Sequence, residues 1–426
     1  MKILVIGGGG REHALAWVLA GDSRQPELFC APGNAGTAAL GTNLDIAATD
    51  VDALVEWARE HRPDLTVVGP EAPLCLGVVD RFATEGLRAF GPRRDAAQLE
   101  GSKSFAKDIM RSAGVPTAWA KTFTDPDDAK RCVRERGAPI VIKADGLAAG
   151  KGVAVCESVE DADEALDAVL GQRRFGDAGA SVLVEEFMAG EEASILALVD
   201  GKSMILLPSS QDHKRAFDGD NGPNTGGMGA YSPAPVITPA LWPDIRDTVL
   251  QPTIDELNRR GISFKGVLYA GLMITESGPK VVEYNVRFGD PEAQCVLPRL
   301  KGDLIPVLEA CIDGTVRDDM LESIDNACVC VVMAAGGYPG AYAKGSPIHG
   351  LDEANAIDRV QVFHAGTRID GGQAVTAGGR VLGVTASGAD LDEALNRAYA
   401  GVERITFAGA QYRADIGSRA RAGSPR

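Results

Sequence analysis

Strand and helix patterns alternate along the first 100 residues, and this alternation constrains the fold more than any other feature of the 426-residue chain. Short apolar runs typical of buried strands are separated by stretches with helical spacing. Strands are expected at Lys2 to Ile6, Leu28 to Ala31, Leu65 to Val68 and Arg88 to Phe90, and helices at Arg11 to Ala20, Val51 to His61 and Val78 to Glu85. This order predicts a parallel, doubly wound α/β sheet over residues 1–100.

Three of these strands end in turns rich in glycine or proline, at residues 7–10, 31–36 and 69–73. Ligands of doubly wound sheets bind at the carboxyl ends of the strands. The first turn lacks the dinucleotide fingerprint, because Glu12 stands where the third glycine would be. A phosphate bound at the following helix N-terminus is the functional interpretation, with Arg11 adding charge and Glu71 available for ribose hydroxyls. The alternative is that the glycines only permit tight turns.

The stretch from Val281 to Glu292 concentrates more functional side chains than any other part of the chain. A strand period of two places Glu283, Asn285 and Arg287 on one face, opposite an apolar face. A carboxylate and an amide oxygen at this spacing suit a hard cation such as Mg²⁺, and the guanidinium beyond them suits an anion. The apolar run Leu268 to Thr275 precedes this strand, so a hairpin is expected. A solvated amphipathic strand is the alternative, and the apolar neighbour argues against it.

A glycine-rich segment, residues 144–152, follows an apolar strand that ends at Lys143. A Walker A loop would need four residues between its glycines, then Ser or Thr and a helix, and this segment has none of these. It is predicted to be a hairpin flap that covers phosphates with backbone N–H groups, while Lys143 supplies a point charge. Residues 185–192 are expected to form a hinge whose backbone pairs with an adenine edge. Around this segment, helices are expected at Ser102 to Ser112 and Asp161 to Leu170, and strands at Val153 to Cys156 and Ser181 to Glu185.

Residues 209–229 contain so much Gly, Asn and Pro that a long loop without regular structure is expected there. His213 in this loop is equally compatible with a role in binding and with a satisfied loop histidine. From residue 319 onward strands and helices alternate again. We expect an α+β lid domain in this region, with residues 418–426 as a disordered tail.

Charge and cysteine content restrict the partners of the chain. The formal net charge of −16 argues against nucleic acid and anionic membranes, because both attract basic patches. The N-terminal strand is too short and too glycine-rich for a signal peptide, and no apolar run reaches transmembrane length. The eight cysteines include no CxxC pair, and they are expected to be reduced core thiols of a cytoplasmic protein.

The order of these features resembles that of the ATP-grasp enzymes. Four long motifs are similar to those of the phosphoribosylamine glycine ligase family, at residues 143–152, 209–214, 222–233 and 287–294. Residues 336–340 and 364–367 also match that family, so the resemblance covers nearly the whole chain. It implies a doubly wound domain at 1–100, an ATP-grasp central domain at 101–122 and 190–318, a flap subdomain at 123–189 and an α+β lid domain at 319–426.

The resemblance also implies a reaction and a set of site residues. The reaction is ATP-dependent ligation of glycine to 5-phosphoribosylamine through a glycyl phosphate, in purine biosynthesis, by a cytoplasmic monomer that uses Mg²⁺ or Mn²⁺. The resemblance implies that Arg287, Asp290 and Lys214 act in catalysis, with Asp290 expected to hold the glycine ammonium. It also implies that Glu283 and Asn285 bind the metal. ATP binding falls to Lys103, Lys143, Gly150, Lys151, Gly152, Glu185, Glu186, Phe187, Met188 and Glu192. Substrate binding falls to Gly9, Gly10, Arg11, Glu71, Asp212, Asn224, Thr225, Gly226 and Gly289.

Two rival functions stay open at this point. Another ATP-grasp ligase or carboxylase would keep the ATP-binding half and change the acceptor, but the motifs at 222–233 and 287–294 argue against it. A nucleotide-binding regulator without catalysis would not need the row formed by Glu283, Asn285 and Arg287. A phosphate-release assay with glycine and phosphoribosylamine separates a regulator from an enzyme.

Overall fold

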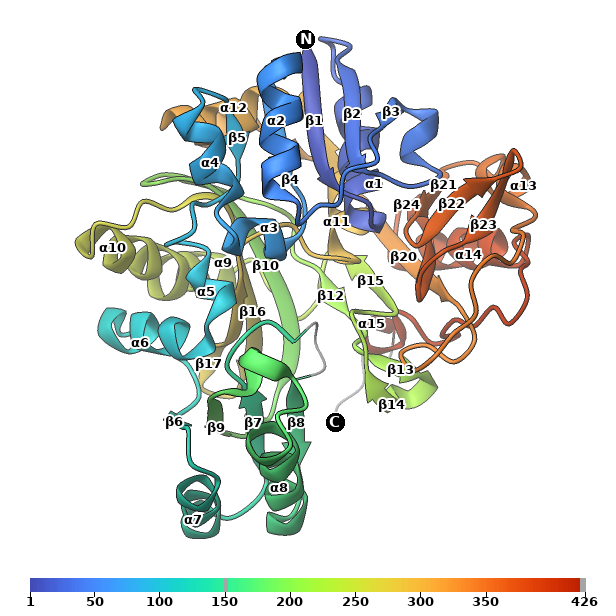
Figure 1. Ribbon diagram of the computed structural model, residues 1–426. Helices are drawn as coiled ribbons and strands as arrows, with labels where there is room; N and C mark the ends of the chain where they lie inside the picture. Colours follow the sequence, from blue (N-terminus) through green and yellow to red (C-terminus); the bar gives the residue numbers. More distant parts are fainter. Residues whose placement is uncertain (149–151, 422–426) are drawn as a thin grey trace.

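The computed structural model describes residues 1–148 and 152–421. Its N-terminal part is a parallel sheet in the strand order β3-β2-β1-β4-β5 (Figure 1). The strands are β1 Lys2–Gly7, β2 Glu27–Pro32, β3 Thr42–Asn43, β4 Leu65–Val68 and β5 Ala89–Phe90. The helices are α1 Gly10–Ala20, α2 Val51–His61, α3 Glu71–Cys75 and α4 Val78–Thr84. The predicted doubly wound sheet is confirmed, with β3 and α3 as elements that the sequence analysis did not predict.

Strand β1 is apolar throughout because both faces of the sheet are covered. Ile3 and Val5 belong to one hydrophobic core, Leu4 and Ile6 belong to another, and all four are fully buried. A parallel sheet with helices on both faces requires this pattern. The helices α5 Gln98–Gly101 and α6 Lys103–Ala113 then lead from this sheet to the rest of the chain.

The flap subdomain is an antiparallel sheet in the order β6-β9-β7-β8. Its strands are β6 Ala120–Phe123, β7 Ile140–Ala144, β8 Val153–Cys156 and β9 Val182–Glu186. Its helices are α7 Pro126–Arg136 and α8 Val159–Leu166, the latter continued by a π-helical turn at Asp167–Gly171. The glycine-rich segment joins β7 to β8 as predicted, although its residues 149–151 lie outside the described part of the chain.

The central sheet, in the order β11-β10-β16-β17, contains the expected hairpin. Its strands are β10 Glu191–Asp200, β11 Met204–Leu206, β16 Lys265–Thr275 and β17 Gly278–Asn285, with the helices α9 Leu241–Ile245 and α10 Gln251–Arg259 nearby. A β-bulge at Val282 interrupts the register between β16 and β17. Because the bulge adds one residue, Val281 turns toward the core beside Tyr284 and Val286, instead of sharing the face of Glu283.

The C-terminal sheet has the order β12-β15-β20-β24-β21. Its strands are β12 Gln211–Asp212, β15 Gly229–Ser232, β20 Ala327–Ala334, β21 Val360–His364 and β24 Arg380–Gly388. Two small ladders are β18 Leu300–Lys301 with β19 Glu322–Ser323, and β22 Thr367–Asp370 with β23 Gln373–Thr376. The helices are α11 Glu292–Val296, α12 Leu304–Asp313, α13 Leu351–Asn355 and α14 Leu391–Val402. Two strands of this sheet precede residue 318, so a boundary drawn there cuts through one sheet.

Two predictions about irregular segments were wrong. Residues 209–229 contain β12 and a hairpin of β13 Arg215–Phe217 with β14 Asn221–Asn224, because Gly219 adopts a left-handed φ of 69° that permits a tight turn. Residues 418–421 of the expected disordered tail 418–426 form the short helix α15 Ser418–Arg421 instead, and residues 422–426 lie outside the described residues. Arg419 anchors this helix through an ion pair with Asp220 at 2.6 Å.

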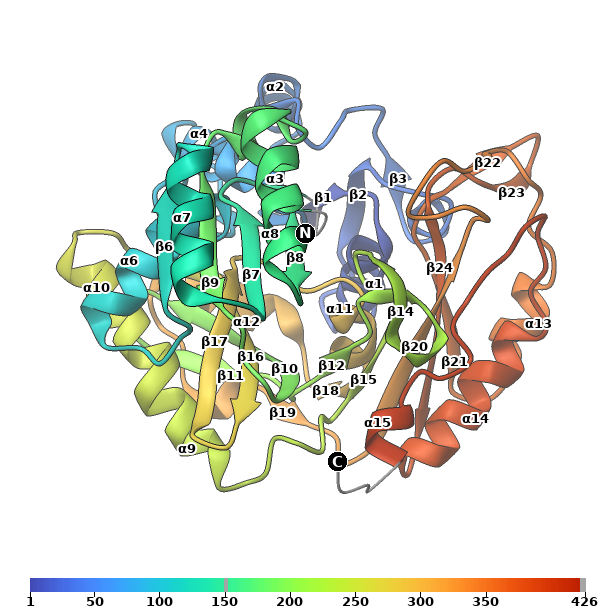
Figure 2. The ribbon, with the colours of Figure 1, turned by 90° about the horizontal axis from the view of Figure 1, so that it is seen from below.

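The domains surround a central space. Seen from below, the flap subdomain and the C-terminal domain lie on opposite sides of the molecule (Figure 2). The N-terminal sheet lies at one end of this space, and the flap subdomain lies at the other (Figure 1). All eight cysteines are free thiols, and seven of them are buried, as predicted. Within the described residues no helix is long and apolar enough to cross a membrane.

Candidate active site

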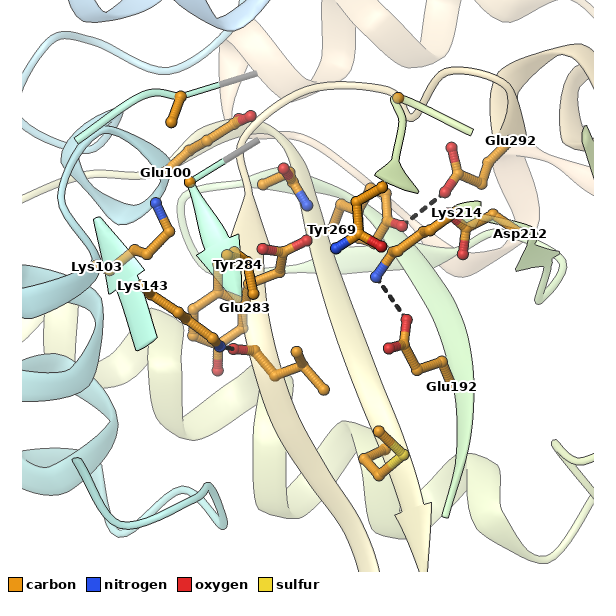
Figure 3. A pocket seen from close by; sticks show the side chains of 18 of the residues that line it. Glu100, Lys103, Lys143, Glu192, Asp212, Lys214, Tyr269, Glu283, Tyr284 and Glu292 are labelled. Carbon is orange, nitrogen blue, oxygen red and sulfur yellow. Dashed lines mark hydrogen bonds and ion pairs between the residues drawn. The ribbon is translucent and has the colours of Figure 1, made fainter. Parts of the chain in front are cut away.

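A cavity of about 800 Å³ lies where the domains meet. Figure 3 shows part of its lining, with Lys103 and Lys143 on one side and Asp212, Lys214 and Glu292 on the other. The residues predicted from the sequence that line it are Arg11, Glu71, Lys103, Lys143, Gly152, Glu185, Phe187, Met188, Glu192, Asp212, Lys214, Asn224, Thr225, Gly226, Glu283, Asn285, Arg287 and Asp290. Segments far apart in the sequence thus contribute to one site.

Four predicted residues in the described part of the chain are not part of this lining, and two others cannot be placed. Gly150 and Lys151 lie outside the described residues. Glu186 is exposed, and its carboxylate accepts a hydrogen bond from the Trp119 N–H group at 3.2 Å. The other three are Gly9, Gly10 and Gly289. Two of them allow close packing, since a Cβ atom on Gly10 would lie 2.4 Å from Gln294, and one on Gly289 would lie 2.3 Å from Glu292.

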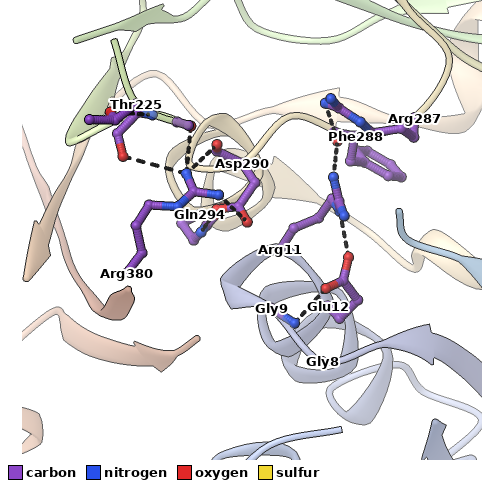
Figure 4. Close-up of polar contacts among 12 residues, drawn as sticks. Gly8, Gly9, Arg11, Glu12, Thr225, Arg287, Phe288, Asp290, Gln294 and Arg380 are labelled. Carbon is purple, nitrogen blue, oxygen red and sulfur yellow. Dashed lines mark hydrogen bonds and ion pairs between the residues drawn. The ribbon is translucent and has the colours of Figure 1, made fainter. Parts of the chain in front are cut away.

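The loop at the N-terminus of α1 is hydrogen-bonded to a side chain of α1 itself, that of Glu12. The Glu12 carboxylate accepts the Gly9 N–H group at 2.6 Å and the Arg11 guanidinium at 2.5 Å. Arg11 also donates to the Phe288 carbonyl at 3.2 Å, which ties this helix to the end of β17 (Figure 4). The Gly9 N–H group, predicted as part of a phosphate site, therefore already has an acceptor within the chain.

The polar face of β17 supplies an ionised carboxylate to the cavity. Burial raises the pKa of Glu283, but the charges of Lys214, Lys143 and Lys103 outweigh this effect and hold that pKa below its ordinary value. In the described part of the chain the Glu283 carboxylate has no hydrogen-bond or ion-pair partner. A charged, unpaired oxygen ligand therefore faces the cavity.

Three lysines gather beside β17. Lys143 forms an ion pair with Glu185 at 2.8 Å and donates to the Val282 carbonyl at 3.1 Å. Lys103 donates to the Gly146 carbonyl at 3.1 Å, at the base of the flap. Lys107, one helical turn after Lys103, also faces Glu185 at 3.5 Å, and burial lowers the pKa of Lys107 to about 8. This concentration of cations suits the phosphates of a nucleotide.

Arg287 is held between two acidic residues of the N-terminal part. Its guanidinium lies 2.8 Å from the Glu100 carboxylate and 3.3 Å from that of Glu71. It also donates to the Asn285 side-chain oxygen at 3.1 Å. These contacts fix the plane of the guanidinium, which lines the cavity.

Asp290 already has a cation partner. Its carboxylate lies 3.0 Å from the Arg380 guanidinium and accepts a hydrogen bond from Gln294 at 2.8 Å (Figure 4). Arg380 also donates to the carbonyl groups of Asp290 and Gly226, so it joins the C-terminal domain to two loops of the site. Asp290, which was expected to hold the glycine ammonium, is thus already paired with a cation of the protein, and its role in binding glycine stays a prediction.

Lys214 lies among acidic side chains on the side of the cavity opposite Lys103 and Lys143 (Figure 3). Lys214 pairs with Glu192, and the Thr225 hydroxyl donates to the Lys214 carbonyl at 2.9 Å. Burial lowers the pKa of Lys214, but Glu192 and the nearby Asp212 and Glu283 carboxylates raise it well above its ordinary value. Lys214 is therefore a fixed positive charge. His213 points away into the protein: it is fully buried, and neither ring nitrogen has a hydrogen-bond partner among the described residues.

Glu283 and Asn285 match the ligand chemistry of a hard divalent cation, because both offer oxygen atoms. Within residues 1–148 and 152–421, no group of three or more His, Cys, Asp or Glu side chains could hold a metal ion by itself. The remaining ligands would therefore be waters or phosphate oxygens, which is the usual arrangement for Mg²⁺.

Several cavity residues were missed by the sequence analysis. Lys107 had a usable signal, since it follows Lys103 at helical spacing. Glu292 was recognised as a carboxylate of the 287–294 motif but received no role. The residues Glu100, Tyr269, Arg380 and Arg419 had no local signal, because each reaches the cavity from an element that carries no recognisable motif.

The fold and this cavity define an ATP-grasp enzyme, an ATP-dependent ligase. The chain matches a biotin carboxylase domain of Hydrogenobacter thermophilus with a TM-score of 0.74 at 16% identity, over 96% of this chain and 91% of that one. It also matches the family models described as Phosphoribosylglycinamide synthetase, with the N domain at residues 1–100, the ATP-grasp (A) domain at 101–293 and the C domain at 328–419. The chain belongs to the phosphoribosylglycinamide synthetase family.

Relatives of the same family are similar over their whole length. A phosphoribosylamine–glycine ligase of Xanthomonas campestris is 53% identical over 424 residues, which cover 99% of this chain and 98% of that one. The corresponding protein of Rhodopirellula baltica is 48% identical over 98% of both chains. The crystal structure of phosphoribosylamine–glycine ligase from Thermotoga maritima matches with a TM-score of 0.85 at 34% identity, over 98% of this chain and all of that one.

Proposed function

We propose that this chain uses ATP to join the carboxylate of glycine to the amine of 5-phosphoribosylamine, giving N1-(5-phosphoribosyl)glycinamide, ADP and phosphate in purine biosynthesis. The phosphoribosylamine–glycine ligases to which the chain is similar over its whole length support this reaction. One structural observation carries the proposal: Glu283 and Arg287 line a single cavity together with four lysines and residues of the glycine-rich flap. A nucleotide-binding regulator would not need this arrangement.

The first chemical step is the activation of glycine. A carboxylate is a poor acyl donor, so it attacks the γ-phosphoryl group and becomes glycyl phosphate. This transfer depends mostly on positioning and charge neutralisation, which Lys103 and Lys143 supply from one side of the cavity. A divalent cation, Mg²⁺ or Mn²⁺, held by Glu283 and Asn285 would neutralise further charge on the phosphate oxygens.

The second step is attack of the sugar amine on the glycyl carbonyl. Arg287 faces the carboxylate in the first step and the developing oxyanion in the second, while Lys214 adds a fixed positive charge. The flap, whose Gly152 borders the cavity, excludes water that would hydrolyse the acyl phosphate. Met188 and Phe187 in the segment after β9 provide an apolar surface for the adenine. Glu71, Asn224 and Thr225 are the proposed contacts of phosphoribosylamine.

We also propose that the chain is divided into four parts, is a monomer and is located in the cytoplasm. The four parts are those of the sequence analysis, with the strands at 211–212 and 229–232 added to the C-terminal sheet. A monomer is supported because one chain supplies a complete cavity. A cytoplasmic location is supported by eight unpaired cysteines.

The proposal is tested by phosphate release from ATP with glycine and phosphoribosylamine, which should require all three substrates. Glu283→Gln removes a charge at constant volume and should lower turnover about a hundredfold or more at limiting Mg²⁺, with an unchanged melting temperature. The control is Glu276→Gln, an exposed carboxylate in the turn of the same hairpin. Normal turnover of Glu283→Gln would refute the metal assignment, and no phosphate release by the unaltered chain would refute the reaction.

A further inference from the structure

Among the described residues, the buried Asp212 carboxyl group has no hydrogen-bond or ion-pair partner. Asp212 is 8% exposed and lines the cavity, yet its carboxylate has no hydrogen bond or ion pair in the described part of the chain. Burial raises the pKa of Asp212 to about 7, with Glu292 and Glu192 acting in the same direction. The protein therefore keeps this carboxylate in an unfavourable environment, which a bound cation would relieve.

Glu292 is a second carboxylate on the same side of the cavity (Figure 3). It is 4% exposed and accepts a hydrogen bond from the Tyr269 hydroxyl at 2.7 Å. Tyr269 is fixed in turn by the Ser194 hydroxyl at 2.7 Å. Glu292 has no cation partner among the described residues. Its orientation is set by the protein, while its charge is not compensated by an ion pair.

Apart from Glu283, which is assigned to the metal, the charged groups nearest to these two carboxylates already have partners within the protein. Lys214 is paired with Glu192, and Asp290 is paired with Arg380. Arg287 is held by Glu71 and Glu100 on one side. Burial lowers the pKa of Arg287, whereas Glu100, Glu71 and Glu292 raise it. Glu292 and Arg287 line the same cavity, so one small molecule with opposite charges at its two ends can be placed between them.

We propose that Asp212 and Glu292 form the receptor for the ammonium group of the amino acid substrate, with the substrate carboxylate directed toward Arg287. This proposal rests on the proposed function, since it names the subsite of that reaction that recognises glycine. It transfers the role that the sequence analysis gave Asp290 to two carboxylates that are free to perform it.

The receptor also has a chemical purpose. An ammonium between two carboxylates keeps its proton, because nearby negative charge favours the charged form. A protonated amine is not a nucleophile, so a bound glycine cannot attack a second activated glycine. The carboxylate end of the substrate then remains the only reactive end, and the amine that attacks it must come from the other substrate.

The test compares Asp212→Asn and Glu292→Gln with the unaltered enzyme, with Glu276→Gln as the control for loss of one carboxylate charge. Each site variant should raise the KM for glycine about 10- to 100-fold, the value of one charge-assisted hydrogen bond. The KM for ATP and the melting temperature should change little. Tyr269→Phe, which releases Glu292, should produce a smaller rise in the same constant.

A second measurement follows recognition of the ammonium directly. Glycolate has the carboxylate of glycine but a neutral hydroxyl group in place of the ammonium. The ratio of kcat/KM for glycine to that for glycolate, measured by ATP consumption, should fall at least tenfold in Asp212→Asn. An unchanged ratio, or a loss confined to kcat with an unchanged KM for glycine, would overturn the proposal. Failure of the proposed function is distinguishable, because the unaltered enzyme itself would then be inactive with glycine.

Discussion

At the scale of single residues, the cavity depends on how burial and charge are balanced. Glu100 shows this balance: burial raises its pKa to about 6, although Arg287 lowers it, and the Val286 N–H group donates to it at 2.8 Å. Glu71, also next to Arg287, has a pKa below its ordinary value despite burial, because Arg287 and Arg11 outweigh the loss of hydration. One guanidinium thus keeps the buried Glu100 carboxylate and the partly buried Glu71 carboxylate in the site, where an unpaired charge would be costly.

Glycine recognition should depend on pH through Asp212. Because its pKa is raised to about 7, the carboxyl is neutral below pH 7 and charged above it. The value of kcat/KM for glycine should fall about tenfold per pH unit as the pH drops below 7 and level off above it. The charged groups that face Asp212 are Lys214, Glu192, Glu292 and Arg419, together with the Tyr269 hydroxyl.

The control for this titration is Asp212→Asn, in which the dependence near pH 7 should disappear. Lys214 cannot cause it, since its pKa lies well above its ordinary value and the group stays charged over this range. A profile with the same inflection near pH 7 in Asp212→Asn would assign the titration to another group.

At the scale of elements, two short features aim side chains at the cavity. The bulge at Val282 keeps Val281 in the core while Glu283 faces the site, which a regular strand would not achieve. The helix α15 holds the segment that carries Asp212, because Arg419 donates to the Asp212 carbonyl at 3.4 Å and pairs with Asp220. A segment near the end of the chain therefore supports the substrate side of the cavity.

Removing the Arg419 side chain should loosen this support. Arg419→Ala should lower kcat/KM for glycine about 3- to 10-fold, because one hydrogen bond and one partly buried ion pair are lost near Asp212. The matched control is Arg421→Ala in the same helix, whose exposed partner is Asp392. Equal kinetics for the two variants would show that α15 does not support the site.

At the scale of the whole molecule, Arg380 joins the C-terminal domain to the central domain. Its side chain is 21% exposed and that of Asp290 is 15% exposed, so this ion pair is largely shielded from water. Gly226 lies against the same guanidinium, since a Cβ atom there would lie 3.0 Å from it. The C-terminal domain is thus part of the wall of the cavity.

Arg380→Ala should cost about 3 kcal/mol of stability, because it leaves the buried Asp290 carboxylate without its cation. A melting temperature several degrees lower and a large loss of ligase activity are expected. The control is Arg397→Ala, which breaks an ion pair with Glu393 within helix α14. If both variants melted at the same temperature as the unaltered enzyme, the Arg380 ion pair would not hold the domains together.

The sequence by itself determined the elements that arise from local chemistry. Periodicity identified the parallel N-terminal sheet and the hairpin of β16 and β17, because side-chain spacing decides which face of a strand is apolar. It also placed Glu283, Asn285 and Arg287 on one face, which only required counting along a strand. It did not find the β13–β14 hairpin, because the turn at Gly219 depends on a backbone angle that composition does not encode.

Only the tertiary structure decided which charges meet. Asp290 and Arg380 are 90 residues apart, and Arg419 and Asp220 are 199 apart, so no local pattern links the members of either pair. Whether a carboxylate is neutralised or left free for a ligand depends on such contacts between distant elements. Asp290 is paired, whereas Asp212 has no such partner within residues 1–148 and 152–421. This difference therefore follows from the packing of the domains, because electrostatic partners are chosen by distance in space.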